Sequence, residues 1–322
     1  MSLIDYEALI NKWDSSRSEE DVLIRVDAEH PLDFFIGKDD AGNRVLALIS
    51  DYEPSKISSS KSLTVLKNNR AIDGRWAIKI KLVNSEFSDV FLHLCFDLIE
   101  ACGYAENELN GVEIFVSRFT KWQKMMESGY EEMSVSVIKG LLGELLFIDK
   151  ILFNKMDRGS AIKAWLGPEG SDRDFVFSET WAEIKTIGVD KDSVAISSLD
   201  QLDIPQVGYL GVIRLEKTTA SDKDGFSFNG IINMIIKKLE LYPSINYIFK
   251  NKLLKLGYRN RENYDNMYFV YKGIKFYKVD ATFPKLIPEN VREEIIKATY
   301  SLSLAAIKDW KVEDIDGVRN IS

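Results

Sequence analysis

The first part of the chain carries an alternation of apolar and polar residues that predicts antiparallel strands. Between two of these runs lies the polar segment Lys38–Asn43, which contains Ala-Gly-Asn and is a strong signal for a hairpin turn. A short amphipathic helix, Leu3–Asp14, is expected before them. The expected strands are Leu32–Gly37, Val45–Ser50, Lys61–Leu66 and Arg75–Val83. Residues 1–85 are therefore predicted to form a β-rich N-terminal unit.

After these strands the hydrophobic period changes to that of a helix, at Asp89–Cys102 and Val112–Met126. Gly208–Leu215 is a continuous apolar run, typical of a buried central strand. Further helices are expected at Ala161–Leu166, Phe228–Leu239 and Pro243–Leu256, and further strands at Asp174–Phe177, Trp181–Ile187, Val194–Ser197, Met267–Tyr271, Ile274–Asp280 and Ala298–Ile307. Residues 86–322 are thus predicted to form an α/β domain.

The segment Val135–Phe153 is apolar on almost every side when it is drawn as a helix, which predicts a buried helix. Gly140 and Gly143 each cost about 1 kcal/mol of helix propensity relative to alanine, unless close packing requires a small residue. Glu144 lies in the middle of this apolar surface, where a carboxylate needs a partner. One alternative is a salt bridge to a lysine or arginine across the helix interface. The other, which we favour, is membership of an acidic metal site.

A predicted hairpin within residues 170–201 brings acidic and basic side chains to the edge of an apolar sheet. Asp174 opens the first strand, and Glu183 and Lys185 share one face of the second because side chains alternate along a strand. Carboxylate oxygens are the ligands that a hard divalent cation such as Mg²⁺ selects. The alternative is a polar face that is simply solvated, although this E-I-K segment is the only E-x-K triplet in the sequence.

The length of the connection between the two predicted strands determines whether the acids can meet. Asp174 can face Glu183 only if the strands are joined by an even-length loop or contain a bulge. A three-residue loop would set Asp174 opposite Ile184 instead. Downstream, Ser198-x-x-Gln201 matches a capping box, which predicts that Ser198 starts a helix and that Gln201 reaches back to cap it.

The composition limits the chemistry that is open to the chain. Cys95 and Cys102 lack a C-x-x-C context and lie in a predicted helix, so neither a disulfide framework nor a cysteine-zinc site is expected. The only histidines are His30, in a loop before a proline, and His93, for which we expect a structural role in a helix. An active site would therefore depend on carboxylates, lysine and metal.

No segment of the sequence is apolar over the length needed to cross a membrane, and the N-terminus lacks the basic start and apolar core of a signal peptide. An apolar content of 45% is enough to bury a substantial core. We therefore expect a soluble protein of a reducing compartment, the cytoplasm, with no membrane partner.

The net charge of −8 excludes a basic surface over the whole molecule but leaves a local one open. Residues 237–261 carry seven lysines and arginines against one glutamate, with four aromatic residues between them. One alternative is the solvated face of two helices whose aromatic residues lie in the core. Beside a metal site, the same patch would contact a phosphate backbone. The residues expected in that contact are Lys252, Lys255 and Arg259.

The order and spacing of these motifs resemble the core of the PD-(D/E)xK nuclease superfamily. More narrowly, G-x-x-G-E-L, G-x-x-x-D-F, W-x-E-I-K-T and I-S-S-x-x-Q-L are similar to the motifs of a family linked to that superfamily, domain of unknown function 4420. They lie between Gly140 and Leu202, and the resemblance extends along most of the chain. Arg173 stands where the superfamily motif has proline, a position that varies. The resemblance implies a restriction-endonuclease-like α/β core, a mixed sheet flanked by helices.

The resemblance also implies roles for individual residues. The expected ligands of Mg²⁺ or Mn²⁺ are Asp174, Glu183, Glu144 and the backbone carbonyl of Ile184. Lys185 would orient or help to activate the attacking water and stabilise the transition state. Gln201 would be an auxiliary polar residue near that lysine.

Two functions are compatible with these observations. The first is a metal-dependent endonuclease that hydrolyses DNA in a restriction–modification or phage-defence setting, with protein partners encoded alongside. The oligomeric state, a homodimer included, stays open. The second is a catalytically inactive nuclease fold that binds DNA or a partner protein, which the acidic net charge favours. The intact set of Asp174, Glu183 and Lys185 favours the first, which is our leading hypothesis.

Overall fold

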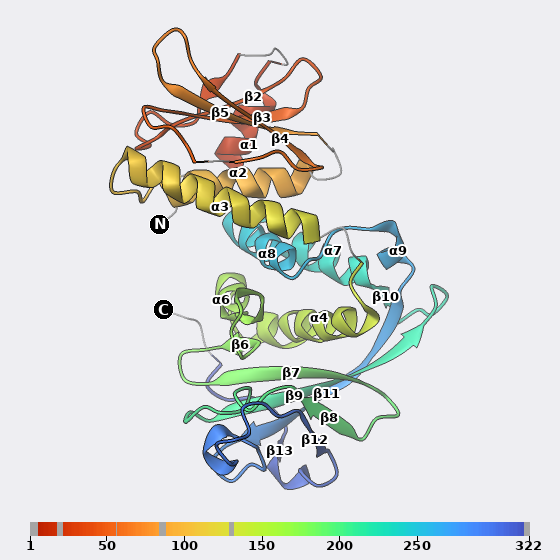
Figure 1. Cartoon of the computed structure of the whole chain (residues 1–322). Helices are drawn as coiled ribbons and strands as arrows, with labels where there is room; N and C mark the ends of the chain where they lie inside the picture. Colours follow the sequence, from red (N-terminus) through yellow and green to blue (C-terminus); the bar gives the residue numbers. More distant parts are fainter. Residues whose placement is uncertain (1–5, 18–21, 56, 84–87, 129–131, 319–322) are drawn as a thin grey trace. The chain divides into compact units, whose positions relative to one another are not determined.

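The computed structural model of the chain describes residues 6–17, 22–55, 57–83, 88–128 and 132–318. The chain divides into two compact units, residues 1–132 and 133–322. Each unit has a sheet and a hydrophobic core of its own, and most of the helices and strands of both are labelled in Figure 1.

The N-terminal unit contains a five-stranded antiparallel sheet in the order β1-β2-β3-β5-β4. Its strands are β1 (Ile24–Arg25), β2 (Asp33–Lys38), β3 (Arg44–Ser50), β4 (Leu63–Asn69) and β5 (Trp76–Leu82). The predicted hairpin is confirmed, because Lys38 pairs with Arg44 across the turn. Gly42 has a φ of 81° in that turn, a conformation that glycine adopts without steric cost.

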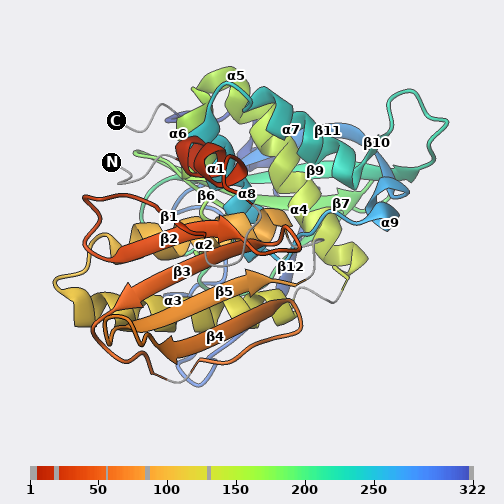
Figure 2. The same cartoon turned by 90° about the horizontal axis from the view of Figure 1, so that it is seen from above.

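Helices cover one face of this sheet. They are α1 (Tyr6–Asp14), α2 (Ser88–Cys102) and α3 (Glu108–Ser128). α1 confirms the expected N-terminal helix, whose first three residues lie outside the described part of the chain. Figure 2 shows α2 and α3 behind the strands, and Phe34 of β2 lies 5.9 Å from Phe115 of α3 between ring centroids. Because both helices pack on the N-terminal sheet, the first unit extends to residue 132, beyond the boundary expected at residue 85.

The histidines and cysteines belong to the interior of this unit. His93 is buried and stacks on Tyr6 at 5.5 Å between ring centroids, which confirms its structural role. Cys95 and Cys102 are free, buried thiols. Burial raises the pKa of Cys102 to about 12, so it remains a protonated, unreactive side chain.

The C-terminal unit is built on a mixed sheet in the order β10-β11-β9-β7-β6, with β13 paired to β11. Its strands are β6 (Phe175–Val176), β7 (Trp181–Gly188), β9 (Gly208–Thr218), β10 (Phe226–Ser227), β11 (Tyr268–Val279) and β13 (Lys311–Val312). β7 and β9 are parallel, whereas β6 is antiparallel to β7. β9 is buried along most of its length, as predicted for a central strand. The α/β fold class expected from the sequence is confirmed.

Different layers cover the two faces of this sheet (Figure 1). One face carries the helices α4 (Val135–Phe147) with its π-helical continuation η2 (Ile148–Leu152), α5 (Phe153–Lys155), α6 (Arg158–Ala164), α7 (Phe228–Lys238), α8 (Pro243–Lys255) and α9 (Glu262–Asp265). The other face carries a two-stranded sheet of β8 (Ser193–Ile196) and β12 (Tyr300–Ser303). Side chains of β7 alternate between these layers: Ala182 and Ile184 join the helical core, and Trp181 joins the opposite one.

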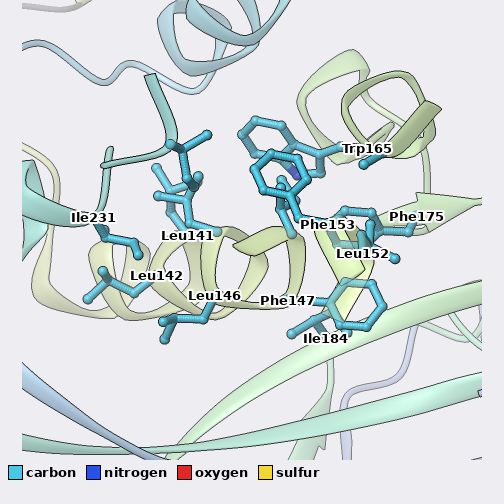
Figure 3. Packing of buried hydrophobic residues seen from close by; sticks show 14 of the residues in the cluster. Leu141, Leu142, Leu146, Phe147, Leu152, Phe153, Trp165, Phe175, Ile184 and Ile231 are labelled. Carbon is cyan, nitrogen blue, oxygen red and sulfur yellow. The ribbon is translucent and has the colours of Figure 1, made fainter. Parts of the chain in front are cut away.

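α4 is the helix predicted to be apolar on nearly all sides, and Figure 3 shows its leucines and Phe147 packed in different directions. Phe147 meets Phe175 of β6 at 4.8 Å between ring centroids. A Cβ added at Gly143 would overlap the hydroxyl of Thr186, so the glycine allows α4 to approach β7 closely. Apart from the chain neighbours and the backbone of α4 itself, no described atom lies within 4 Å of the corresponding position at Gly140, so packing against other segments does not explain that glycine.

Four predicted elements differ from the structure. The capping box at Ser198 starts no helix, because residues 198–207 form a loop whose carbonyl groups accept hydrogen bonds from side chains elsewhere. The two late strands merge into β11, which has a bulge between Tyr271 and Ile274. β12 is shorter than the strand expected over Ala298–Ile307, and turns follow it.

Candidate active site

The acid-bearing hairpin has the connection that the sequence required. A two-residue turn, residues 178–179, joins β6 to β7 and is closed by a backbone hydrogen bond of 2.8 Å. Phe175 pairs with Ala182 in the antiparallel register. One step further along both strands, Asp174 is therefore opposite Glu183. The prediction that these two acids face each other across adjacent strands is confirmed.

Backbone groups from two elements hold Asp174 in place. Its Oδ2 accepts a hydrogen bond of 2.7 Å from the backbone amide of Ile184 in β7. Its carbonyl oxygen accepts bonds from the amides of Leu166 and Gly167, at 2.8 and 3.1 Å. Gly167 begins the 3-10 turn η3 (Gly167–Glu169), which follows α6. The carboxylate of Asp174 therefore has a defined direction.

Glu144, from α4, points to the same place as Asp174. A Cβ added at Gly167 would lie 3.4 Å from both Glu144 Oε2 and Asp174 Oδ1. The two oxygens therefore border one small space, which glycine leaves open. Glu144 Oε2 also accepts a hydrogen bond of 2.6 Å from the indole Nε1 of Trp165. Its polar partner is thus an indole and not the cation of a structural salt bridge.

Glu183, Lys185 and Gln201 form a connected polar group. Lys185 Nζ lies 2.8 Å from Glu183 Oε1, and Gln201 Nε2 donates to the same oxygen at 3.0 Å. Lys185 Nζ also donates to Gln201 Oε1 at 3.3 Å. Glu183 is only 2% exposed, and its second oxygen, Oε2, finds no hydrogen-bond partner among the described residues. Such a buried carboxylate oxygen is costly unless a cation or a proton satisfies it.

Burial raises the pKa of all three acids. For Asp174 the pKa lies well above its usual value, and the charges of Glu144 and Glu183 raise it further. Burial raises the pKa of Glu144 to about 7, although the hydrogen bond from Trp165 opposes the change. The pKa of Glu183 is also raised by burial, against the opposing charge of Lys185. The site is therefore short of positive charge, since each acid ionises less readily than in water.

The donor set of the site fits a divalent cation. Carboxylate oxygens from Asp174, Glu144 and Glu183 are the ligands that Mg²⁺ or Mn²⁺ prefers. The unpartnered Glu183 Oε2 and the space beside Gly167 are points where a cation would satisfy negative charge. Within the described part of the chain, no group of three or more His, Cys, Asp or Glu side chains is close enough to hold a metal ion as it stands. Glu183 Oε1 is turned toward the polar group, so the three carboxylates converge only in part.

Two of the three predicted nucleic-acid contacts are buried, which corrects that prediction. Lys252 is buried; its Nζ donates to the backbone carbonyl of Trp165 and lies 3.2 Å from Glu169 Oε1. Arg259 is also buried, and its Nη1 donates to a backbone carbonyl of the same unit at 2.7 Å. Both cations satisfy carbonyl groups at or beyond the ends of helices, where the helix itself supplies no donor. Lys255 is exposed and remains a candidate contact.

Three residues beside the acids had no role assigned from the sequence: Trp165, Gly167 and Arg173. Trp165 and Gly167 contact the carboxylates as described, and Arg173 Nη2 donates to the carbonyl oxygens of Asp200 and Asp203 at 2.8 and 2.7 Å. The sequence did contain a signal for two of them. A Gly-Pro pair begins at Gly167, shortly before the acid-bearing strand. Arg173 stands in place of the motif proline, directly before Asp174.

The class of the protein follows from the order in which the acids occur along a mixed sheet. One acid lies on a helix, the next precedes an edge strand, and the third lies two residues before a lysine on the neighbouring strand. That order is the pattern of a PD-(D/E)XK nuclease-like protein.

A comparison with family models agrees with this class. Residues 5–305 match the family domain of unknown function 4420, described as "Putative PD-(D/E)XK family member". The chain belongs to this family, and the resemblance seen in the sequence is confirmed. No curated protein and no solved structure gives a significant match. Among the helices that the structure describes, none has both the length and the apolar character needed to cross a membrane.

Proposed function

We propose that the chain is an endonuclease that hydrolyses DNA phosphodiester bonds with the help of Mg²⁺ or Mn²⁺. The observation that carries the proposal is Glu183 Oε2, a buried carboxylate oxygen without a described partner, near two further acids whose pKa values are raised. Acids held at such a cost in free energy are typical of functional sites. Membership of a PD-(D/E)XK family supports the same reaction class.

The cation ligands that we propose are Asp174, Glu183, Glu144 and the backbone carbonyl of Ile184. When bound, the cation supplies a more acidic water and screens the negative charge of the phosphodiester. The amide of Ile184 holds Asp174 Oδ2 at 2.7 Å, and the indole of Trp165 holds Glu144 Oε2 at 2.6 Å. Both acids are therefore oriented before substrate arrives, which lowers the cost of reaching the reactive geometry.

Lys185 would orient the attacking water and stabilise negative charge on the phosphate in the transition state. Its Nζ lies 2.8 Å from Glu183 Oε1, and its side chain is 18% exposed, so it can contact both the acids and solvent. Gln201 Oε1 accepts a further hydrogen bond of 3.3 Å from this nitrogen. The ammonium group thus has the charge and the support that the role requires.

The proposed setting is a restriction–modification or phage-defence system of the cytoplasm, as the sequence resemblance suggested. Proteins encoded alongside, or a second copy of the chain, would then contribute to the choice of target. We keep Lys255 as the proposed contact with the DNA backbone, because it is exposed.

Calorimetric metal titration followed by a DNA nicking assay tests this function. Wild-type protein should bind Mg²⁺ or Mn²⁺ and nick plasmid DNA, whereas Glu183→Ala should lose both properties because it removes the unpartnered oxygen. Glu179→Ala is a matched control, since Glu179 is an exposed acid in the turn of the same hairpin. It should leave both properties unchanged.

Equal cleavage by Glu183→Ala and wild type would contradict the proposal, because the activity would then come from a contaminating nuclease. Metal binding without cleavage of DNA would instead support the second function, a catalytically inactive nuclease fold that binds DNA or a partner protein. The net charge of −8 is the observation that favours this alternative, because it weakens the attraction for a phosphate backbone.

A further inference from the structure

Side chains of other segments donate hydrogen bonds to the backbone of the segment that carries Gln201. Residues 197–207, called the Gln201 loop below, join β8 to β9, and this segment, which the structure describes in full, contains neither helix nor strand. Hydrogen bonds to its carbonyl groups include Thr180 Oγ1 to Val207 O at 2.8 Å, Trp181 Nε1 to Gln206 O at 3.1 Å and Lys285 Nζ to Leu202 O at 2.9 Å. The conformation of the Gln201 loop therefore depends strongly on its surroundings.

Arg173 holds the part of the loop that contains Gln201 itself. Its Nη2 donates to the carbonyl oxygens of Asp200 and Asp203, at 2.8 and 2.7 Å. These two residues flank Gln201 in the sequence. Because Arg173 directly precedes Asp174, a single side chain links the acid-bearing strand to the loop.

The hydrogen bonds of Arg173 go to the carbonyl groups of the Gln201 loop, and its charge also acts to lower the pKa of Glu183. The carboxylate of Asp172 lies 3.8 Å from Arg173 Nη1 and is largely exposed, which makes that pair weak. The side chain of Arg173 is only 17% exposed, and its Nε has no hydrogen-bond partner among the described residues. A planar guanidinium with two bonds to the loop carbonyls restricts their position more than a flexible ammonium would.

The position of the Gln201 loop determines which end of the Gln201 amide meets Glu183. The backbone amide of Ser197 donates to Gln201 Oε1 at 2.8 Å, and Lys185 Nζ donates to the same oxygen at 3.3 Å. Two donors on Oε1 leave Nε2 to face Glu183, where it donates to Glu183 Oε1 at 3.0 Å. Gln201 therefore holds one oxygen of Glu183 and leaves Oε2 for another partner.

We propose that Arg173 is a positioning residue, which holds the Gln201 loop so that Gln201 orients Glu183 and Lys185 for the cation and the water. The inference rests on the function proposed above and adds a residue to that site. It also accounts for arginine at the position of the motif proline. A proline has no side-chain donor and could reach neither loop carbonyl.

A double-mutant cycle on metal affinity tests this role. Arg173→Ala should weaken the calorimetric affinity for Mn²⁺ roughly 10–100-fold, the usual effect of losing a residue that supports a metal ligand. Gln201→Ala should weaken it to a similar extent. The double variant should be little weaker than either single variant, because Arg173 acts through Gln201. Arg173→Lys, which keeps a donor and the charge, should recover part of the loss.

Arg214→Ala provides a matched control. Arg214 Nη1 also donates to two backbone carbonyls, those of Gly188 at the end of β7 and of Val189 after it, at 3.2 and 2.8 Å, but this segment does not carry Gln201. Its loss should leave metal affinity unchanged. Hydrogen exchange gives an independent readout without metal: residues 197–207 should exchange faster in Arg173→Ala and at the wild-type rate in Arg214→Ala.

The outcomes separate this inference from the proposed function. If wild type binds Mn²⁺ and Arg173→Ala binds it equally well, the positioning role is overturned and the proposed function stands. Additive effects of Arg173→Ala and Gln201→Ala would also overturn it. If wild type binds no metal, the proposed function fails, and the positioning role for the cation fails with it. If Arg173→Ala does not fold, Arg173→Lys and Arg173→Gln take its place in the cycle.

Discussion

Each unit of the molecule contains a group of three carboxylates with a basic side chain beside it, but the two groups are built differently. In the N-terminal unit, Arg75 bonds Asp33 and Asp51 at 2.7 Å each and lies 3.4 Å from Glu108. All three acids meet the guanidinium directly at a partly exposed surface. The hydrogen bond to Asp33 is the main reason that the pKa of Arg75 is raised.

The group in the C-terminal unit lacks this balance. Glu183 bonds Lys185, whereas Asp174 and Glu144 receive bonds from a backbone amide and an indole, which are neutral. Burial therefore raises the pKa of all three acids. All three acids of the Arg75 group have a cationic partner, whereas in the acid group only Glu183 has one. We interpret that lack as the property of a binding site.

The largest effect should come from removing Lys185, the cation that bonds Glu183. Lys185→Ala should slow DNA cleavage about 10²–10³-fold, the usual effect of removing a charge-stabilising donor from an active site. Lys275→Ala removes an exposed lysine of β11 in the same sheet and should cleave at the wild-type rate. Single-turnover assays with enzyme in excess measure both. An equal loss in the two variants would show that the effect is general and not specific to the site.

The next effect concerns the packing that brings Glu144 to the hairpin. Gly143→Ala should lower the free energy of unfolding by about 1–3 kcal/mol, because its Cβ would overlap the hydroxyl of Thr186. Gly140→Ala, in the same helix, should raise it by about 0.5–1 kcal/mol, because the position is open and alanine favours a helix. Urea unfolding measures both changes. Stabilisation by Gly143→Ala would contradict the close approach of α4 to β7.

Proton linkage should distinguish the two groups of acids. Affinity for Mn²⁺ should increase as pH rises toward about 7, by roughly tenfold per pH unit for one proton released. The reason is that Glu144, with a pKa of about 7, must lose a proton before it can bind the ion. Deprotonation of Asp174 and Glu183, whose pKa values are also raised, adds to this dependence. Calorimetry in buffers of different ionisation enthalpy counts the protons released, and Glu144→Gln should release fewer. Glu108→Gln, in the Arg75 group, should leave the count unchanged.

The stability of the metal-free protein should depend on pH in the opposite direction. A raised pKa means that the folded state binds more protons than the unfolded state. The contribution of Glu144 to stability therefore decreases as pH rises from the ordinary value of 4.5 to about 7. This contribution is the free energy of unfolding of wild type minus that of Glu144→Gln. A difference that stays the same at every pH would contradict the raised pKa of Glu144.

Removing one acid from each group should change stability in opposite directions. Asp174→Asn should stabilise the metal-free protein by about 1 kcal/mol near pH 8, because it relieves repulsion at a functional site. The gain should shrink as pH falls and Asp174 takes up a proton. Asp33→Asn should instead cost up to about 1 kcal/mol, because it breaks contacts with Arg75 and Arg25. Destabilisation by both variants in chelator-treated protein would contradict the contrast.

The smallest effect concerns DNA contact at the surface. Lys255→Ala should reduce the slope of log affinity against log salt concentration by about 1, the contribution of one phosphate contact. Lys252→Ala should leave the slope unchanged and lower stability instead, because it removes the donor to the Trp165 carbonyl. Filter binding over a range of salt concentrations compares them. An unchanged slope in Lys255→Ala would assign that lysine to ordinary solvated surface.

The acid-bearing hairpin could be predicted from the sequence because it depends on local rules. Alternation along β7 puts Glu183 and Lys185 on one face, and the length of the turn sets Asp174 opposite Glu183. The apolar residues on almost every side of α4 likewise predicted a buried helix in which Glu144 needs a partner. These features need no knowledge of distant segments.

The rest depends on contacts between segments far apart in the sequence. No motif near Glu144 indicates that the indole of Trp165 will bond it. Helical periodicity alone could not show that Lys252 turns inward, where it meets a carbonyl at the end of α6. The capping box at Gln201 failed because Arg173 and other side chains bond the backbone of a loop there. Tertiary hydrogen bonds, which no local pattern encodes, decide these cases.

The two-residue turn between β6 and β7 also limits how this hairpin can evolve. If an added residue were taken up by a slip of β6 by one position against β7, Phe175 would take the place of Asp174 opposite Glu183. Phe175 belongs to the helical core, so such a change would remove an acid and open a void at once. Insertions should therefore survive only where the added residues stay within the turn and leave the pairing of Phe175 with Ala182 unchanged.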